Sequence, residues 1–89
     1  MKELTWDQVL RRTDLIGGEA EFATGESAYR RPLTEIRDEG EWLTLHSTDG
    51  EWICHLEKEY VPYETENGHV YIKLPLPSPA HSVTILPVT

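Results

Sequence analysis

The chain has 89 residues, of which 16 are acidic and eight are basic, and its formal charge at pH 7 is −8. A chain of this length predicts a single domain, residues 1–89, with one modest hydrophobic core. Its one cysteine, Cys54, excludes a fold held by internal disulfides. No stretch approaches the roughly 20 apolar residues of a membrane-spanning helix. The first residues, MKELTWDQVLRR, contain no apolar signal-peptide run, so we expect a cytoplasmic protein.

A short amphipathic helix is predicted over residues 5–12. Thr5 is a suitable N-cap, and Gln8 follows three residues later, as in a capping box. Trp6 and Val9 lie at helical spacing and would share one face. Because so short a helix is unstable alone in water, we expect this face to pack on the rest of the chain.

The next segment predicts a bend followed by a pair of strands. Gly17-Gly18 indicates a sharp turn or a close approach of two backbones, because neither residue has a Cβ. Strands are predicted over 19–24 and 27–38, with Phe22 opposite Tyr29. Pro32 interrupts the second strand, and a proline inside a strand indicates an edge, a bulge or a corner.

The best-specified stretch predicts a β-hairpin with strands over 41–48 and 51–57. Asp49-Gly50 is a strong signal for a two-residue type I′ turn, and that turn defines which residues face each other. Since side chains alternate between faces, the core face is predicted to carry Leu43, Leu45, Ser47, Trp52, Cys54 and Leu56. The outer face is predicted to carry Trp42, Thr44, His46, Ile53, His55 and Glu57.

A partner-binding surface is predicted on that outer face. A turn at Glu39-Gly40 would bring Arg37 opposite Trp42, within reach of a cation–π contact. The predicted partner-binding residues are Arg37, Trp42, His46, Ile53 and His55. Exposed tryptophan and arginine are typical of interface anchors. Either the N-terminal helix or the proline-rich segment could instead cover this face, and a homodimer contact is a further alternative. The prediction requires Trp52 to point inward and Trp42 outward, and it fails if both rings lie on one side.

Three more strands are predicted over 60–66, 69–74 and 82–88. Asn67-Gly68 indicates a second type I′ turn, which would place Val61, Tyr63, Thr65, Val70, Ile72 and Leu74 on one face. Pro62 indicates an edge strand, and the three prolines within 75–82 indicate a stiff, extended connection. The set of elements predicts a small antiparallel SH3-like barrel, or a half-open β-roll, with one N-terminal helix.

No catalytic, cofactor or metal site is predicted. His46 and His55 would be diagonal neighbours on one face, but a metal site needs a third ligand and Cys54 points to the other face. Cys54 is expected to be a buried thiol and not a nucleophile, and no G-x-S-x-G elbow is present. We therefore expect a non-catalytic protein-interaction module without a cofactor.

Nucleic-acid binding is the alternative function. The negative charge of the chain repels phosphate backbones at long range, which disfavours it. Arg30, Arg31 and Arg37 precede Trp42, however, and a mixture of arginine and tryptophan can stack on bases. A small barrel that binds nucleic acid through these four residues is the second hypothesis.

Two segments resemble short uncharacterised bacterial proteins found in metagenomic genomes. They are WDQVLRRTDLIGGEAEF, residues 6–22, and YRRPLTEIRDEG, residues 29–40. The similar proteins read roughly W-x-x-L-x-x-R-x-D-L-I-G-G-E-I-E and then Y-R-G-P-I-x-E-I, so Arg31 stands where that pattern has glycine. The resemblance implies no activity. It implies that Gly17-Gly18 and residues 29–32 are framework features, and that the source is prokaryotic.

Overall fold

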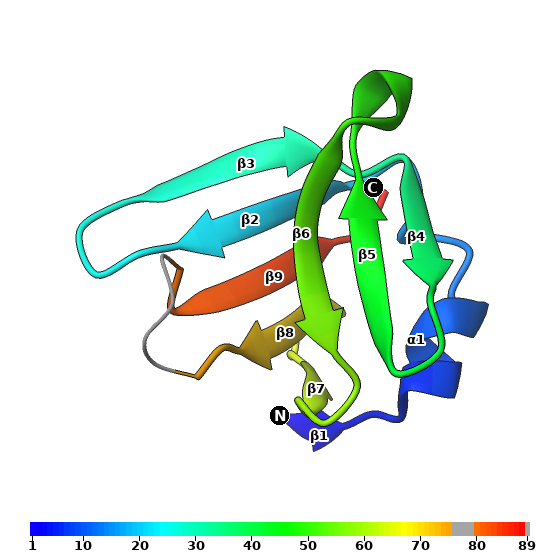
Figure 1. Cartoon of the computed structure of the whole chain (residues 1–89). Helices are drawn as coiled ribbons and strands as arrows, with labels where there is room; N and C mark the ends of the chain where they lie inside the picture. Colours follow the sequence, from blue (N-terminus) through cyan, green and yellow to red (C-terminus); the bar gives the residue numbers. More distant parts are fainter. Residues whose placement is uncertain (76–79, 89) are drawn as a thin grey trace.

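A computed structural model describes residues 1–75 and 80–88 of the chain. Its elements are β1 (Lys2–Glu3), α1 (Trp6–Arg11), β2 (Glu19–Ala23), β3 (Ala28–Pro32), β4 (Glu35–Asp38), β5 (Trp42–His46), β6 (Trp52–Glu57), β7 (Pro62–Glu64), β8 (Val70–Lys73) and β9 (Ser82–Leu86). One antiparallel sheet has six strands in the order β1-β7-β8-β9-β2-β3, and a second has three in the order β4-β5-β6 (Figure 1). The prediction of a mainly β, antiparallel chain with one short N-terminal helix is confirmed.

The core lies between the two sheets. Alternate residues of β8 and β9 supply Val70, Ile72, Val83 and Ile85, and all four are almost fully buried. The three-stranded sheet contributes Leu45 and Leu56, and the segment after the helix contributes Leu15. Such burial is worth about 1.5–3 kcal/mol for each large apolar side chain, which holds the two layers face to face.

The helix α1 closes one end of this core. Thr5 and Gln8 form the predicted capping box, with the Gln8 backbone N–H donating to the Thr5 hydroxyl at 3.1 Å. The Trp6 indole N–H lies 2.9 Å from two backbone carbonyl oxygens, those of Lys58 and Tyr60. Through these contacts α1 packs beside the β6–β7 connection, so it does not lie over the outer face of β5 and β6 (Figure 1).

The predicted strand 27–38 is two strands in two different sheets. β3 pairs with β2 in the predicted register, Phe22 opposite Tyr29 and Glu21 opposite Arg30. After Pro32 the chain turns a corner at Leu33, which is fully buried, and continues as β4 in the three-stranded sheet. Proline cannot donate to a ladder, so the corner falls where β3 pairing ends.

The β7–β8 hairpin has a different register from the predicted one. Thr65 N–H donates to His69 at 2.9 Å and Gly68 has a φ of +79°, so three residues and not two form the loop. A one-residue change of register turns a strand over. Pro62 is therefore buried and Val61 is exposed, the reverse of the prediction.

The edge position predicted from Pro62 is wrong. β7 is not an edge strand, because β1 pairs with it and Leu4 N–H donates to the Pro62 carbonyl at 2.9 Å. β1 has only two residues, too few for a sequence pattern to reveal. Residues 76–79 of the predicted stiff connection over 75–82 lie outside the described residues. No helix within the described residues is long and apolar enough to cross a membrane.

Gly18 is where two backbones approach each other, as predicted from the pair of glycines. A Cβ at Gly18 would lie 2.0 Å from the Leu86 carbonyl oxygen. We expect Gly18→Ala to destabilise the fold by about 3 kcal/mol in urea unfolding, since a backbone atom must move to relieve the clash. Gly25→Ala is the matched control, because its Cβ would meet only the His81 side chain, and should cost less than about 1 kcal/mol. Equal losses for the two variants would contradict this interpretation.

Candidate functional site

Trp52 and Ile53 have exchanged the faces that were predicted for them. β5 and β6 pair as expected at Leu45 and Cys54, but His46 then pairs with Trp52. The loop spans three residues, Thr48–Gly50, and an irregularity at Ile53 restores the register further along. Trp52 is therefore 58% exposed, while Ile53 packs against the core.

The predicted partner-binding surface consequently fails the condition stated for it, which placed Trp52 inward and Trp42 outward. Paired residues point to the same side, so Trp52 shares the outer face with His46 and, two pleats away, with Trp42. Both indole rings lie on one side of the hairpin, which the sequence-based surface excluded, and Ile53 does not belong to that surface. The exposed aromatic side chains of this face are Trp42, Trp52 and His55.

His46 is a structural residue and not a surface contact. It is 5% exposed, and its Nε2 lies 2.9 Å from the hydroxyl of Thr44, which is also buried. Its Nδ1 lies 3.2 Å from the Gly50 carbonyl oxygen. A carbonyl can only accept, so Nδ1 carries a proton, and in the neutral ring the Thr44 hydroxyl donates to Nε2. His46 thus connects β5 to the loop that sets the position of Trp52.

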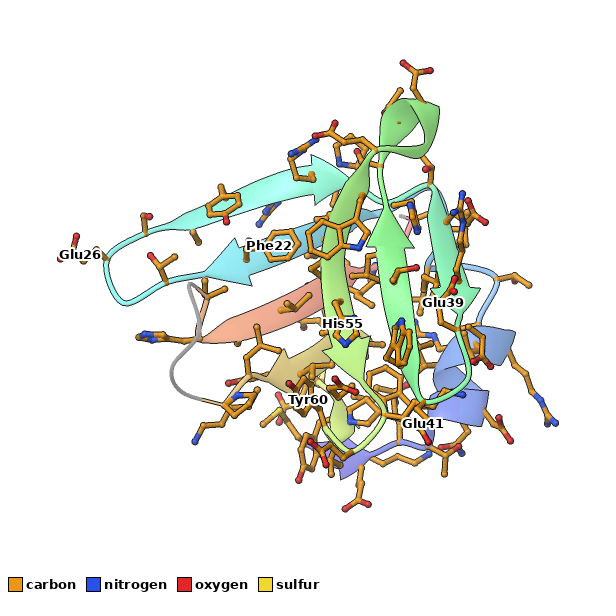
Figure 2. All side chains as sticks on the ribbon, viewed as in Figure 1. Phe22, Glu26, Glu39, Glu41, His55 and Tyr60 are labelled. Carbon is orange, nitrogen blue, oxygen red and sulfur yellow. The ribbon has the colours of Figure 1, made fainter. Side chains whose placement is uncertain are left out.

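Trp42 and His55 are exposed and contact each other, as their predicted positions require. Their ring centroids are 5.4 Å apart at an interplanar angle of 27°, in a stacked arrangement. His55 Nε2 lies 2.9 Å from a carboxylate oxygen of Glu57 on the same strand. Figure 2 shows His55 in front of β6, with Glu39 and Glu41 at the turn between β4 and β5. The stack holds the Trp42 ring in place while 37% of the residue stays exposed.

Arg37 lies on the predicted face but opposite a different residue. It pairs with Thr44, not with Trp42, because the β4–β5 turn is centred on Gly40-Glu41 and Gly40 takes a φ of +103°. A shift of two residues preserves the face. Arg37 Nε lies 2.9 Å from a Glu35 carboxylate oxygen, and this contact lowers the pKa of Glu35 and raises that of Arg37.

All three arginines of the nucleic-acid alternative have acidic partners. Arg30 Nε lies 2.7 Å from Glu21, and Arg31 Nη2 lies 2.5 Å from Glu51. Arg37 pairs with Glu35, as described. Because each guanidinium is paired with a carboxylate, these three side chains do not present free positive charge beside Trp42. The arrangement disfavours an electrostatic groove for a phosphate backbone.

The acidic residues, in contrast, are concentrated around the three-stranded sheet. Residues 35–59 contain eight of the 16 acidic residues and two of the eight basic ones, which is a formal charge of −6 out of −8. Strand pairing places Glu57 opposite Trp42 and Glu35 opposite His46, so both carboxylates lie on the outer face. Glu51 instead contacts Arg31 of β3. The outer face of this sheet therefore combines exposed aromatic rings with carboxylates.

Cys54 and the histidines do not form a reactive site in the described part of the chain. Burial raises the pKa of the Cys54 thiol to about 12, so the thiolate that a nucleophile needs is scarce at neutral pH. Within residues 1–75 and 80–88, no three histidine, cysteine or acidic side chains converge on a position that could hold a metal ion.

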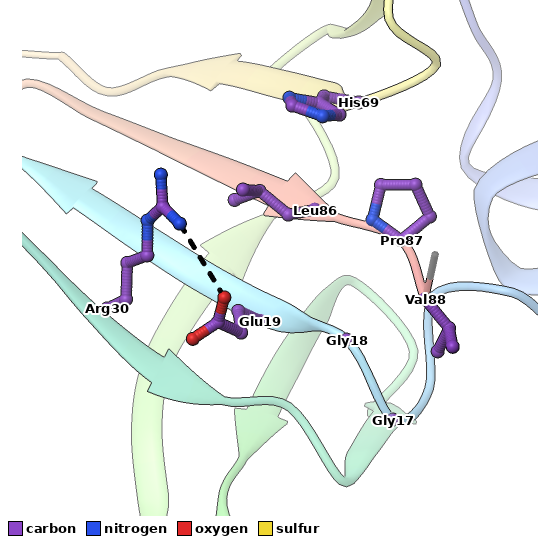
Figure 3. A pocket seen from close by; sticks show the side chains of 8 residues that line it. All are labelled: Gly17, Gly18, Glu19, Arg30, His69, Leu86, Pro87 and Val88. Atoms are coloured by element: carbon purple, nitrogen blue, oxygen red, sulfur yellow. Dashed lines mark ion pairs between the residues drawn. The ribbon is translucent and has the colours of Figure 1, made fainter.

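A surface pocket of about 390 Å³ lies at the other side of the molecule, where β2 begins and β9 ends (Figure 3). It was not predicted from the sequence. Arg30 and Glu19 face each other across it at 3.7 Å. The backbone N–H groups of Gly17 and Gly18 donate to carbonyls of Leu33 and Leu15, so they are not free to bind an anion. His69 also lines the pocket, so its polar side chains are those of Glu19, Arg30 and His69.

Comparison of the chain with protein-family models, with curated proteins and with solved structures finds no match.

The buried role of His46 can be tested by Thr44→Val. This variant keeps the side-chain shape but leaves Nε2 of His46 without its hydroxyl partner. We expect a loss of about 1–3 kcal/mol in the free energy of unfolding. Thr84→Val is the control, because the Thr84 hydroxyl takes part in no hydrogen bond of the described residues, and it should change stability by less than about 0.5 kcal/mol. Equal stability of Thr44→Val and the wild type would contradict the assigned role.

The raised pKa of Cys54 predicts slow alkylation. At pH 8, iodoacetamide should modify the folded protein more than about a hundredfold more slowly than the urea-unfolded chain, whose thiol has an ordinary pKa. The rate can be followed by mass spectrometry. Similar rates in the two states would mean that the thiol is neither buried nor held protonated.

Proposed function

We propose that this chain is a non-catalytic protein-interaction module that presents the outer face of the three-stranded sheet to a protein partner. The observation that carries the proposal is the pair of exposed indoles, Trp42 and Trp52, on one side of the same hairpin. They stand four strand positions apart, or about 13 Å along the sheet. Exposed tryptophans on a rigid element are typical anchors of protein interfaces.

Pre-organisation of this face supports the proposal. Trp42 is held by its stack on His55, and the floor between the two indoles is made of the buried pair Thr44 and His46. Side chains that are already ordered lose less conformational entropy when a partner binds. Leu43 and Leu45 fill the core-facing side of β5, so the core does not need the Trp42 indole on the other side. A large aromatic side chain that is held in contact with water is therefore available to a partner.

The finer description of the fold and its location belong to the same proposal. Of the two architectures expected from the sequence, the SH3-like barrel and the half-open β-roll, the separate hydrogen bonding of the two sheets favours the roll. A cytoplasmic location agrees with the single thiol, Cys54, which is free and half-buried. The non-catalytic assignment agrees with the bonded imidazole of His46 and the protonated thiol.

Substitution of the two indoles tests the proposal. Immobilised wild-type protein, Trp52→Ala and Trp42→Ala are compared for the proteins that each retains from a bacterial extract. Tyr71→Ala is the control, since Tyr71 is a half-buried aromatic residue of β8 in the other sheet. We expect a species retained by the wild type and by Tyr71→Ala to fall roughly tenfold or more with Trp52→Ala, as at an interface hot spot. Retention of the same species by all four proteins would contradict the proposal.

The nucleic-acid alternative predicts a different response. Labelled single-stranded oligonucleotide should then bind with an affinity that falls steeply between 50 and 200 mM salt, about tenfold or more for several phosphate contacts. We expect no such binding, because Arg30, Arg31 and Arg37 are paired with carboxylates. Salt-steep binding that is lost with Arg31→Gln would favour the alternative over the protein partner.

A further inference from the structure

β6 is the least protected strand edge among the described residues. Four strands lie at the ends of the two sheets, namely β1, β3, β4 and β6. β1 has two residues, β3 contains Arg30 and Pro32, and three of the four residues of β4 are charged. Short length, proline and charge are the usual means by which proteins keep edges from pairing. β6, with the sequence WICHLE, has six residues, no proline and one carboxylate.

The main-chain groups of His55 and Glu57 point to this open edge. Lys58 N–H donates to the Glu41 carbonyl at 3.1 Å, so residues 41 and 58 form a hydrogen-bonded pair. Such pairs alternate along an antiparallel ladder, which turns the main chain of Leu56 toward β5 and that of its neighbours away from it. The Glu57 carbonyl accepts from Tyr60 N–H at 3.0 Å. The His55 N–H and carbonyl and the Glu57 N–H are left facing the edge.

The two sides of a strand added at this edge would meet different surroundings. On the outer side lie Trp52, His55 and the carboxylate of Glu57, which is opposite Trp42. On the inner side the β2–β3 hairpin extends beyond β6 (Figure 1). There Tyr29, 53% exposed, stacks on Phe22 with centroids 5.5 Å apart. Phe22 is in the core, so its neighbour Tyr29 points to the same side.

We propose that the open edge of β6 accepts an extended basic segment of a partner protein as an added antiparallel strand. Its alternate lysine or arginine side chains lie on the acidic, tryptophan-bearing outer face, where cations are attracted to carboxylates and to indole rings. Its intervening apolar side chains cover Tyr29. Main-chain hydrogen bonds supply affinity, and the alternation supplies specificity. This inference rests on the proposed function and adds the partner's chemistry and binding mode.

Charge argues against a second copy of the chain as the occupant. A dimer formed edge to edge through β6 would bring together two segments that each carry a formal charge of −6. Like charges placed side by side oppose association. A basic segment gains from the same field, and its association should weaken as salt screens the charges.

Synthetic peptides test the proposal on the unmodified protein. The probe is the seven-residue peptide Lys-Val-Lys-Val-Lys-Val-Lys, with both ends blocked, and its acidic counterpart has glutamate in place of each lysine. Binding is followed by tryptophan fluorescence and by NMR shifts of the β6 amides. We expect saturable, sub-millimolar binding of the basic peptide at low salt and none of the acidic one. No binding of the basic peptide, or equal binding of both, would overturn the proposal.

Backbone methylation separates strand addition from simple charge attraction. Residues that pair with His55 and Glu57 point to the outer face, so the lysine amides of the peptide face β6 and the valine amides face away. N-methylation of the lysine amides should weaken binding about tenfold or more, because several main-chain hydrogen bonds are lost. N-methylation of the valine amides is the matched control and should leave the affinity within about threefold. Equal effects of the two modifications would refute strand addition.

A pair of variants at one position makes the same distinction on the protein. His55→Ala removes the ring and keeps the N–H, whereas His55→Pro also removes the N–H that faces the open edge. We expect His55→Pro to bind the peptide about fivefold or more weakly than His55→Ala. Proline is tolerated at such edge positions, and amide spectra verify folding. If His55→Pro does not fold, the two methylated peptides decide the question alone.

The two levels of the proposal fail in different ways. If Trp52→Ala retains every protein that the wild type retains, the interaction surface itself is wrong. If Trp52→Ala loses a partner but the peptide affinity is indifferent to lysine-amide methylation, the surface stands and the strand-addition mode is wrong. Sedimentation of the protein alone completes the test, because a dimer that the basic peptide cannot dissociate would identify a second copy as the occupant and overturn the inference.

Discussion

The length of one loop decides which side chains the three-stranded sheet presents. Thr48–Gly50 forms a three-residue connection in which Asp49 and Gly50 both take positive φ, and the buried His46 bonds to the Gly50 carbonyl beneath it. A two-residue loop would have turned Trp52 inward, against the leucines of the core. With the extra residue, Trp52 points to water and Ile53 takes the place toward the core. The irregularity at Ile53 then restores the pairing of the remaining strand, so the leucines of β5 and β6 stay buried.

The second constraint is the corner between the two sheets. β2 and β3 are hydrogen-bonded in one layer, and the chain enters the other layer at Leu33, which is fully buried. Gly18 lies against the Leu86 backbone at the same corner, and its carbonyl oxygen accepts a hydrogen bond from Leu33 N–H at 2.9 Å. β6 is the last strand of the three-stranded sheet and is left as an open edge, and the β2–β3 hairpin projects past it (Figure 1). The same geometry that packs the core therefore leaves the open edge at which we place a partner strand.

The charge of this surface indicates which class of partner it favours, which the shape of the surface alone does not. The arginines that sequence analysis grouped with Trp42 are each paired with a carboxylate, and pairing of this kind removes them as a phosphate-binding set. Residues 35–59 keep a formal charge of −6, and the carboxylates of Glu35 and Glu57 lie on the same face as the exposed indoles. An acidic, aromatic face on a rigid sheet favours a cationic partner over nucleic acid and over another copy of the chain.

Local signals in the sequence determined the elements, and tertiary packing decided what those elements display. The capping box at Thr5, the facing pair Phe22 and Tyr29, and the alternation at Val83 and Ile85 all appear as the residues require, since each depends on neighbours in the chain or across one tight turn. The exposure of Trp52 and the burial of His46 and Pro62 could not be read in this way. Asp49-Gly50 and Asn67-Gly68 are compatible with loops of two or of three residues, which differ little in local energy but turn the following side chains to opposite faces. The choice between them was made by which apolar set fills the space between the sheets, a property of the whole fold.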